Sequence, residues 1–232
     1  MKNKLYLIPN AINGEPQEAI PSLVGPVIEK VRHFMVERQA SAEKLLKRLN
    51  PQFPIKECVF FELSEHTPFQ EAKKFFEGNL NYDIGIISEA GVPCVADPGA
   101  EIVALAHAKN IEVVPLVGPS SILLALMGSG FNGQNFAFNG YLPKEKDERI
   151  KKLKELERRV FAENQTQIFM EAPYRNQNLF EEALLNLNPK TALCVAADLT
   201  MPTQFIKTLS INEWKKNKPA FDKRPALFLI GR

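Results

Sequence analysis

The sequence is poor in the residues that build disulfide frameworks and metal sites, with 3 cysteines and 3 histidines among 232 residues. Cys58, Cys94 and Cys194 are scattered, and each lies in or beside an apolar run. An odd number of separated cysteines without a C-x-x-C pair argues against a secreted disulfide scaffold and against a zinc site. We therefore expect reduced structural thiols, no metal, and a cytoplasmic protein.

Long apolar runs and a strong charge of one sign are also missing. No apolar stretch approaches the roughly eighteen residues of a membrane-spanning helix, and the short apolar run after the charged start does not suit a secretory signal. The formal net charge is +2, so the balance of charge favours neither nucleic acid nor a membrane, although a local basic patch stays open. A hydrophobic share of 45% is ample for a sizeable core.

Three nucleotide-binding or catalytic motifs are absent or stand in the wrong context. The sequence has neither a P-loop nor a G-x-S-x-G elbow. Residues 128–133, GSGFNG, match G-x-G-x-x-G letter for letter. That fingerprint must follow a strand and open a helix, whereas this segment follows a predicted helix and precedes a predicted strand. We interpret it as a helix end and a turn.

Short apolar runs alternate with amphipathic stretches through the first half of the chain. This rhythm predicts a parallel sheet with crossover helices, and the continuous run at 84–87, IGII, is typical of a strand covered on both faces. The predicted strands are 5–9, 34–37, 58–63, 84–88 and 112–117, and the predicted helices are 40–49, 69–77 and 99–109.

The second half changes character, because its strands follow one another with shorter links. We predict a mixed sheet with helices there, and hence two α/β domains, residues 1–118 and 119–232. The predicted helices are 119–127, 145–159 and 174–186, and the predicted strands are 136–142, 167–171, 192–199, 204–211 and 225–230.

Three loops rich in Gly and Pro, residues 9–14, 88–93 and 118–121, each follow a predicted strand. Ligands of open α/β sheets bind beyond the carboxyl ends of the strands, where small residues let the backbone approach them. The alternative is that these segments are only tight turns. Three such loops at one sheet edge favour a pocket.

Several segments in order resemble a known family. They read SEAGVPCVADPG at 88–99, VPLVGPS at 114–120, FNGYLP at 138–143, FMEAPYR at 169–175 and AADLT at 196–200. Together they are similar to the tetrapyrrole methylase superfamily of class III methyltransferases. Within it they most resemble the branch that methylates ribose 2′-hydroxyls of small-subunit ribosomal RNA, here in a short and divergent form.

The resemblance implies a two-domain α/β protein that binds S-adenosylmethionine in the cleft between its domains, usually as a homodimer. The positions that match the family's cofactor residues come from several segments of the chain. They are Ile8, Pro9, Glu89, Ala90, Gly91, Val92, Ser120, Ser121, Met170, Ala197 and Ala226.

The departures from the family pattern lie mainly on the acceptor side. Glu89 replaces an aspartate, and Asn13-Gly14 exchanges two residues of the first loop. An Asp-Thr-Arg triplet becomes Arg38-Gln39-Ala40, and Ala197 and Met201 replace basic residues. The lost charges lie where RNA phosphates would be met.

Methyl transfer to a hydroxyl needs alignment with the departing sulfur and an orienting or basic group. The candidates are Glu37, His66, Glu171 and Tyr174, each with a plainer reading as a strand-end cap, a surface turn or a helix start. His66 falls in the family's acid–His pair.

Substrate binding is assigned to two arginines, Arg38 and Arg175, because a guanidinium suits phosphate or carboxylate. A basic stretch follows Pro143, and its acids make a solvated helix face the default interpretation, with phosphate contact as the alternative. It comprises Lys144, Lys146, Arg149, Lys151, Lys152 and Lys154.

Three functions remain open from the sequence. The first is methylation of small-subunit rRNA at a ribose 2′-hydroxyl. The second is methylation of a tetrapyrrole or another small molecule. The third is a catalytically silent protein that binds S-adenosylmethionine and acts as a regulator.

Overall fold

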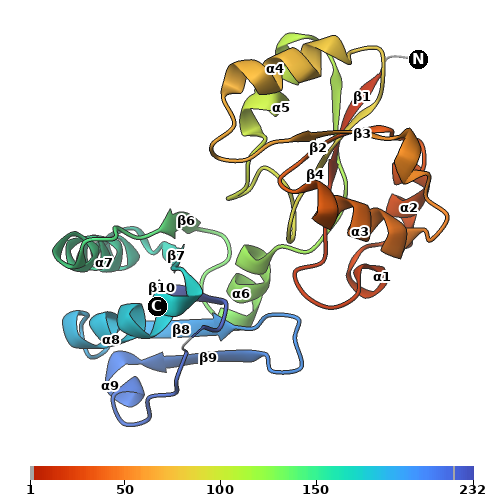
Figure 1. Cartoon of the computed structure of the whole chain (residues 1–232). Coiled ribbons are helices and arrows are strands. Elements are labelled where there is room, and N and C mark those ends of the chain that lie inside the picture. Colours follow the sequence, from red (N-terminus) through yellow and green to blue (C-terminus); the bar gives the residue numbers. More distant parts are fainter. Residues whose placement is uncertain (1–2, 222) are drawn as a thin grey trace. The chain divides into compact units, whose positions relative to one another are not determined.

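The computed structural model describes residues 3–221 and 223–232 (Figure 1). The chain divides into two compact units between Ser120 and Ser121. The boundary predicted after residue 118 falls close to this division. Neither unit, over the described residues, has a helix both long and apolar enough to cross a membrane.

The first unit is built on a parallel sheet, as predicted. Its strand order is β3-β2-β4-β1-β5, and every pairing in it is parallel. Consecutive strands are joined by crossover segments, so the carboxyl ends of all five meet at one edge. The strands are β1 (Lys4–Ile8), β2 (His33–Val36), β3 (Val59–Glu62), β4 (Ile84–Ile87) and β5 (Glu112–Pro115).

Helices cover both faces of this sheet. In Figure 1, α4 and α5 lie on one side and α1, α2 and α3 on the other. All four residues of β4 are buried, as its continuous apolar run predicts. The helices are α1 (Pro16–Ala19), α2 (Gly25–Ile28), α3 (Gln39–Leu49), α4 (Phe69–Gly78) and α5 (Ala100–Ala108), with 3₁₀ turns η1 (Ser22–Val24) and η2 (Ile55–Glu57).

The second unit has the mixed sheet that the sequence predicts. Its order is β6-β7-β10-β8-β9, with β6 parallel to β7 and the other pairs antiparallel. The strands are β6 (Phe136–Tyr141), β7 (Thr166–Met170), β8 (Ala192–Ala197), β9 (Phe205–Ser210) and β10 (Ala226–Gly231). The helices are α6 (Ser121–Ser129), α7 (Lys146–Glu163), α8 (Asn176–Asn186) and α9 (Ile211–Trp214), with η3 (Pro173–Arg175).

Two apolar clusters hold the second unit together. One gathers side chains of α7, α8 and α9, including Trp214, and the other gathers side chains of α6. Gly128 belongs to α6, and a Cβ there would lie 2.8 Å from Ile206. Gly130 has φ +76° just beyond the helix. Residues 128–133 are thus a helix end and turn, as interpreted from the sequence.

The basic stretch needs one correction, at Arg149. Its guanidinium is buried and forms a two-pronged ion pair with Glu182 of α8, with N–O distances of 2.6 and 2.8 Å. It also donates to the carbonyl oxygens of Pro143 and Lys144, at 3.0 and 2.6 Å. Arg149 therefore fixes α7 to α8 and to the preceding loop, and it does not face solvent or phosphate.

Candidate functional site

Two of the three predicted loops are tied together at the carboxyl edge of the first unit's sheet. Asn10 and Gly91 form an isolated antiparallel bridge, with N–O distances of 2.8 and 3.1 Å. The Asn10 amide also donates to the carbonyl oxygens of Ser88 and Glu89, at 3.2 and 3.0 Å. Because β1 and β4 are neighbours in the sheet, the loops that leave them meet directly.

The third loop packs against the other two through glycine. A Cβ on Gly118 would lie 2.1 Å from Cβ of Pro9, so no other residue fits that position without a shift. Gly91 has φ +74°, and a Cβ there would lie 3.1 Å from the carbonyl oxygen of Pro119. Gly91 and Gly118 thus allow the three loops to pack closely at one edge.

Ser88 organises the loop after β4. It is buried, and its hydroxyl bonds a carboxylate oxygen of Asp97, nine residues further along the chain. The hydroxyl oxygen of Ser88 also accepts from the N–H of Ala90 at 3.2 Å. Burial raises the pKa of the Asp97 carboxyl, the bond from Ser88 opposes the rise, and the charge of Glu89 adds to it.

Three acids gather around this edge. Glu37 follows β2, the neighbour of β4, and burial is the main cause that raises its pKa, followed by the charges of Asp97 and Glu89. Glu37 and Asp97 both line a crevice of about 10 Å³, close to the smallest space that holds a water molecule. A pair of partly buried carboxyls with raised pKa values is the kind of arrangement used for proton transfer.

Glu89 is engaged by Arg38 in this structure. The Arg38 guanidinium donates to one carboxylate oxygen of Glu89 from Nε at 3.1 Å and from Nη2 at 2.5 Å. The Arg38 side chain is 72% exposed, so the pair is open to solvent on one side. A residue predicted to bind the cofactor and one predicted to bind the substrate are therefore partners of each other.

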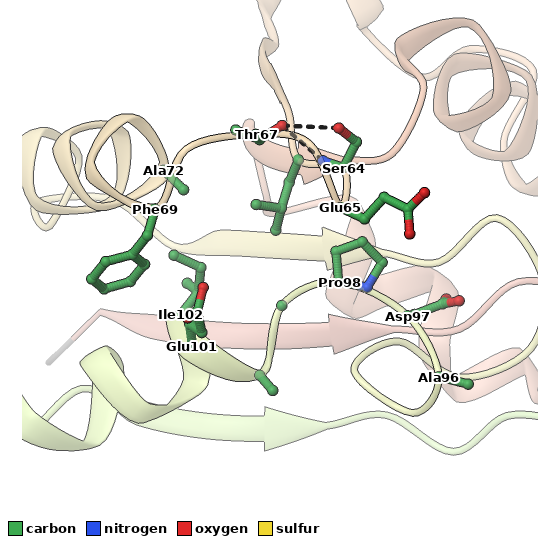
Figure 2. A pocket seen from close by; sticks show the side chains of 13 residues that line it. Ser64, Glu65, Thr67, Phe69, Ala72, Ala96, Asp97, Pro98, Glu101 and Ile102 are labelled. Carbon is green, nitrogen blue, oxygen red and sulfur yellow. Dashed lines mark hydrogen bonds between the residues drawn. The ribbon is translucent and has the colours of Figure 1, made fainter. Parts of the chain in front are cut away.

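A larger cavity of about 430 Å³ opens beside the crevice and shares Leu63, Asp97 and Pro98 with it. Figure 2 shows its walls, which come from the segment after β3 and from the segment that leads into α5. His66 lies on the first of these segments but does not line the cavity, and its side chain is 86% exposed beside Glu65.

Some predicted cofactor positions can act only through their backbone. Ile8 is fully buried in the core of the first unit. Pro9 is buried too, whereas Val92 and Ser120 are partly exposed and Ala90 is exposed.

The second unit brings together the remaining predicted residues at one end of its sheet. Ala197 pairs with Ala226 across β8 and β10, and Met170 pairs with Leu227, the residue after Ala226. Ser121 is the first residue of α6 and is half-buried.

Glu171 directly follows Met170, and its side chain is 1% exposed. It accepts from Arg175 Nη2 at 2.5 Å and from the N–H of Ala172 at 2.8 Å. The Arg175 guanidinium lies 5.3 Å from the ring centre of Tyr174, which is 69% exposed. Glu171 thus acts as a strand-end anchor for Arg175, while Tyr174 faces solvent.

Two polar interactions of the structure could not be predicted from the sequence. Asp97 lies inside a quoted motif, but nothing in the sequence indicates that Ser88 reaches it. Arg224 donates from Nε to Asp198 at 2.7 Å and from Nη2 to the carbonyl of Thr203 at 2.8 Å. No group of His, Cys, Asp or Glu side chains over the described ranges is placed to hold a metal ion.

Comparisons with known proteins give relatives of the sequence and similar folds. No family model matches the sequence. The chain is 35% identical over 197 residues to the ribosomal RNA small subunit methyltransferase I of Halalkalibacterium halodurans, covering 83% of this chain and 64% of that protein. It is 30% identical over 196 residues to the ribosomal RNA small subunit methyltransferase I of Synechocystis sp., covering 84% and 67%. The chain thus spans about two thirds of the length of these relatives.

Solved structures share the fold. The methyltransferase CobJ matches with a TM-score of 0.65 at 13% identity, over 99% of this chain and 94% of that chain. Uroporphyrin-III C-methyl transferase from Thermus thermophilus, complexed with S-adenyl homocysteine, matches with a TM-score of 0.55 at 16% identity, over 99% and 98%. At these identities the likeness shows the two-unit α/β architecture alone.

Proposed function

Because this chain belongs to the ribosomal RNA small subunit methyltransferase I family, we propose that it methylates small-subunit ribosomal RNA with S-adenosylmethionine as the donor. The acceptor is a ribose 2′-hydroxyl. The names of its relatives and the S-adenyl homocysteine in the Thermus structure support this assignment. The observation that carries it in the structure is the packing of three glycine-bearing loops at one sheet edge.

The cofactor is held mainly by backbone in the first unit. Residues 89–92 and Pro9 bring their main chain to the edge where the loops meet, and Ser120 lies within the third loop; the N–H and C=O of Gly91 are held there by Asn10. Small residues there leave room for a ligand to approach the main chain. In the second unit, the proposed cofactor residues are Ser121, Met170, Ala197 and Ala226, the last three of which lie at one end of the sheet.

The reaction is an in-line displacement. The ribose oxygen forms a bond to the methyl carbon as the carbon–sulfur bond breaks, the sulfur leaves as a neutral thioether, and the hydroxyl proton goes to a base. We assign the base to Glu37, because it is partly buried at the carboxyl edge and its pKa is raised toward the working pH. Arg175, anchored by Glu171, contacts phosphate. His66 and Tyr174, both exposed, remain candidates for orienting the acceptor.

Calorimetry of S-adenosylmethionine binding tests the cofactor site. Gly91→Ala puts a Cβ on a backbone with φ +74° and 3.1 Å from the carbonyl oxygen of Pro119, so the loop must shift. We expect the affinity to fall by about tenfold or more, since loop misplacement of an ångström weakens a preorganised site strongly.

Gly130→Ala is the matched control. Gly130 has φ +76° but lies in open space at the end of α6, so this variant carries a similar backbone strain of about 1 kcal/mol without moving the loops. It should bind the cofactor like the wild type. Equal affinities for all three proteins would contradict the proposed site, and no binding by the folded wild type would contradict the proposed function.

From the resemblance of the chain to its family, we further propose that the protein acts in the cytoplasm as a homodimer. Light scattering tests the second point, because a monomer has a mass of 26.1 kDa.

A further inference from the structure

The cavity of about 430 Å³ in the first unit is not used by the cofactor site. None of the residues assigned to S-adenosylmethionine lines it. Its walls are the segment after β3, which holds Glu65 and Phe69, and the segment before and into α5, which holds Asp97 and Glu101. A volume of this size is in the range of small-ligand pockets.

Negative charge dominates the lining. Glu65, Asp97 and Glu101 contribute carboxylates, and among the residues that the structure describes no lysine, arginine or histidine lines the cavity. Nearby, the exposed His66 lies 3.5 Å from Glu65 but outside the lining. A phosphate or carboxylate would be repelled here, whereas a group with N–H donors would be attracted.

The carboxylates do not converge on one point. Figure 2 places Glu101 with Phe69 at one end of the cavity and Glu65 with Asp97 at the other. In keeping with this spread, the described ranges hold no group of acids, histidines and cysteines arranged for a metal ion. The arrangement suits an extended organic molecule with N–H donors better than it suits a metal cation.

Apart from the hydroxyls of Ser64 and Thr67, which bond each other at 3.1 Å, the rest of the lining is mainly apolar. Leu63, Ala72 and Ile102 are buried side chains that form part of the wall, and the Phe69 ring is 37% exposed. Pro98 adds an apolar ring, which Figure 2 shows in the wall. Such surfaces accept an aromatic ring, and an aromatic side chain is a natural stacking partner for a base.

We propose that this cavity binds a nucleobase of the RNA acceptor by its exocyclic amino group, with Glu101 or the Glu65 and Asp97 end accepting the hydrogen bond. Carboxylates are the side chains that read such amino groups. The proposal rests on the proposed function and names its substrate more closely. Since Asp97 and Pro98 also line the crevice of Glu37, a base in the cavity lies next to the assigned proton acceptor.

Saturation-transfer NMR titrations with free nucleosides test the proposal directly. Cytidine carries an exocyclic amino group where uridine carries a carbonyl, and the neighbouring ring nitrogen changes from an acceptor to an N–H donor; adenosine and inosine form a second such pair. The amino-bearing member of each pair should bind about tenfold tighter, the scale of one good base contact. Cytidine 5′-monophosphate should bind no tighter than cytidine, because the lining carries only negative charge.

Charge reversal locates the binding. Of Glu101→Lys and Glu65→Lys, the one that removes the accepting carboxylate should lower the affinity for cytidine about tenfold or abolish the preference over uridine. Both side chains are exposed, so the fold tolerates them. Glu18→Lys, also an exposed acid in the first turn of a helix but outside the cavity, should change nothing.

Equal binding of cytidine and uridine, or equal binding by all variants, would overturn the proposal. This outcome is separable from failure of the proposed function, because cofactor binding is measured independently by calorimetry. A preference for amino-bearing nucleosides without S-adenosylmethionine binding would support the base site and contradict the proposed methyltransferase activity.

Discussion

At the scale of single residues, the Ser88–Asp97 contact is the feature that the sequence could not have revealed. Both residues lie in the recognised SEAGVPCVADPG segment, so the importance of the segment was predictable. Their contact depends on backbone turns at Cys94 and Ala96, which both adopt positive φ without being glycine. Their residue types do not indicate that conformation, because residues other than glycine seldom adopt it.

The raised pKa of Asp97 predicts a pH dependence of stability. In the folded protein this carboxyl holds its proton above its ordinary pKa of 3.8, because it is buried. As the pH rises from 3.8 through the raised pKa, the unfolded chain releases the proton first, so the folded state loses stability; above the raised pKa the loss is complete.

Asp97→Asn removes this titration and keeps an oxygen that accepts from Ser88. We therefore expect the stability of the variant, relative to the wild type, to improve as the pH is raised through that window. Urea unfolding at a series of pH values measures the difference. A difference that stays constant with pH would refute the assignment.

At the scale of elements, the long periodic helices and apolar strands were predictable, and the short helices were not. Residues 16–28 fold into α1, η1 and α2, yet their prolines at 16, 21 and 26 obscure any period in the sequence. Proline is tolerated in a first helical turn, and α1 and α2 both use it there. Such helices of four residues are set by packing and not by pattern.

The same limit explains Arg149. A charge run along α7 predicts a solvated face, but one arginine of the run is buried against Glu182, 33 residues further along. The partner of a buried charge is determined by tertiary packing, which a short stretch of sequence does not reveal.

The Arg149–Glu182 pair predicts a strong coupling between α7 and α8. Arg149→Met should lower the free energy of unfolding by about 3–5 kcal/mol, because it leaves Glu182 buried without its partner. Arg149→Met with Glu182→Met should recover most of that loss, since a buried pair is often replaceable by apolar side chains.

Fluorescence of the only tryptophan reports on this unit. Trp214 is 1% exposed in the second unit, and its indole N–H donates to the carbonyl of Leu193 at 2.8 Å. A single variant as stable as the wild type, or a double variant less stable than the single one, would contradict the coupling.

At the scale of the whole molecule, the chain joins a parallel sheet and a mixed sheet, each with its own core. The alternation of elements predicted this architecture, and the family resemblance predicted its chemistry. The acceptor side was harder to read, because Arg38 and Arg175 are paired with Glu89 and Glu171. Whether an arginine is free for phosphate depends on neighbours that the sequence does not place.

The central claim is tested most directly by transfer of a radiolabelled methyl group from S-adenosylmethionine to small ribosomal subunits, with nuclease mapping of the label. We predict label in ribose of the small-subunit RNA, and a loss of about a hundredfold or more in the rate for Glu37→Gln, in line with the usual contribution of a general base. In a parallel assay with a tetrapyrrole as acceptor, label there and none in RNA would contradict the proposed acceptor. Cofactor binding without transfer to either would contradict catalysis and leave a silent S-adenosylmethionine-binding protein.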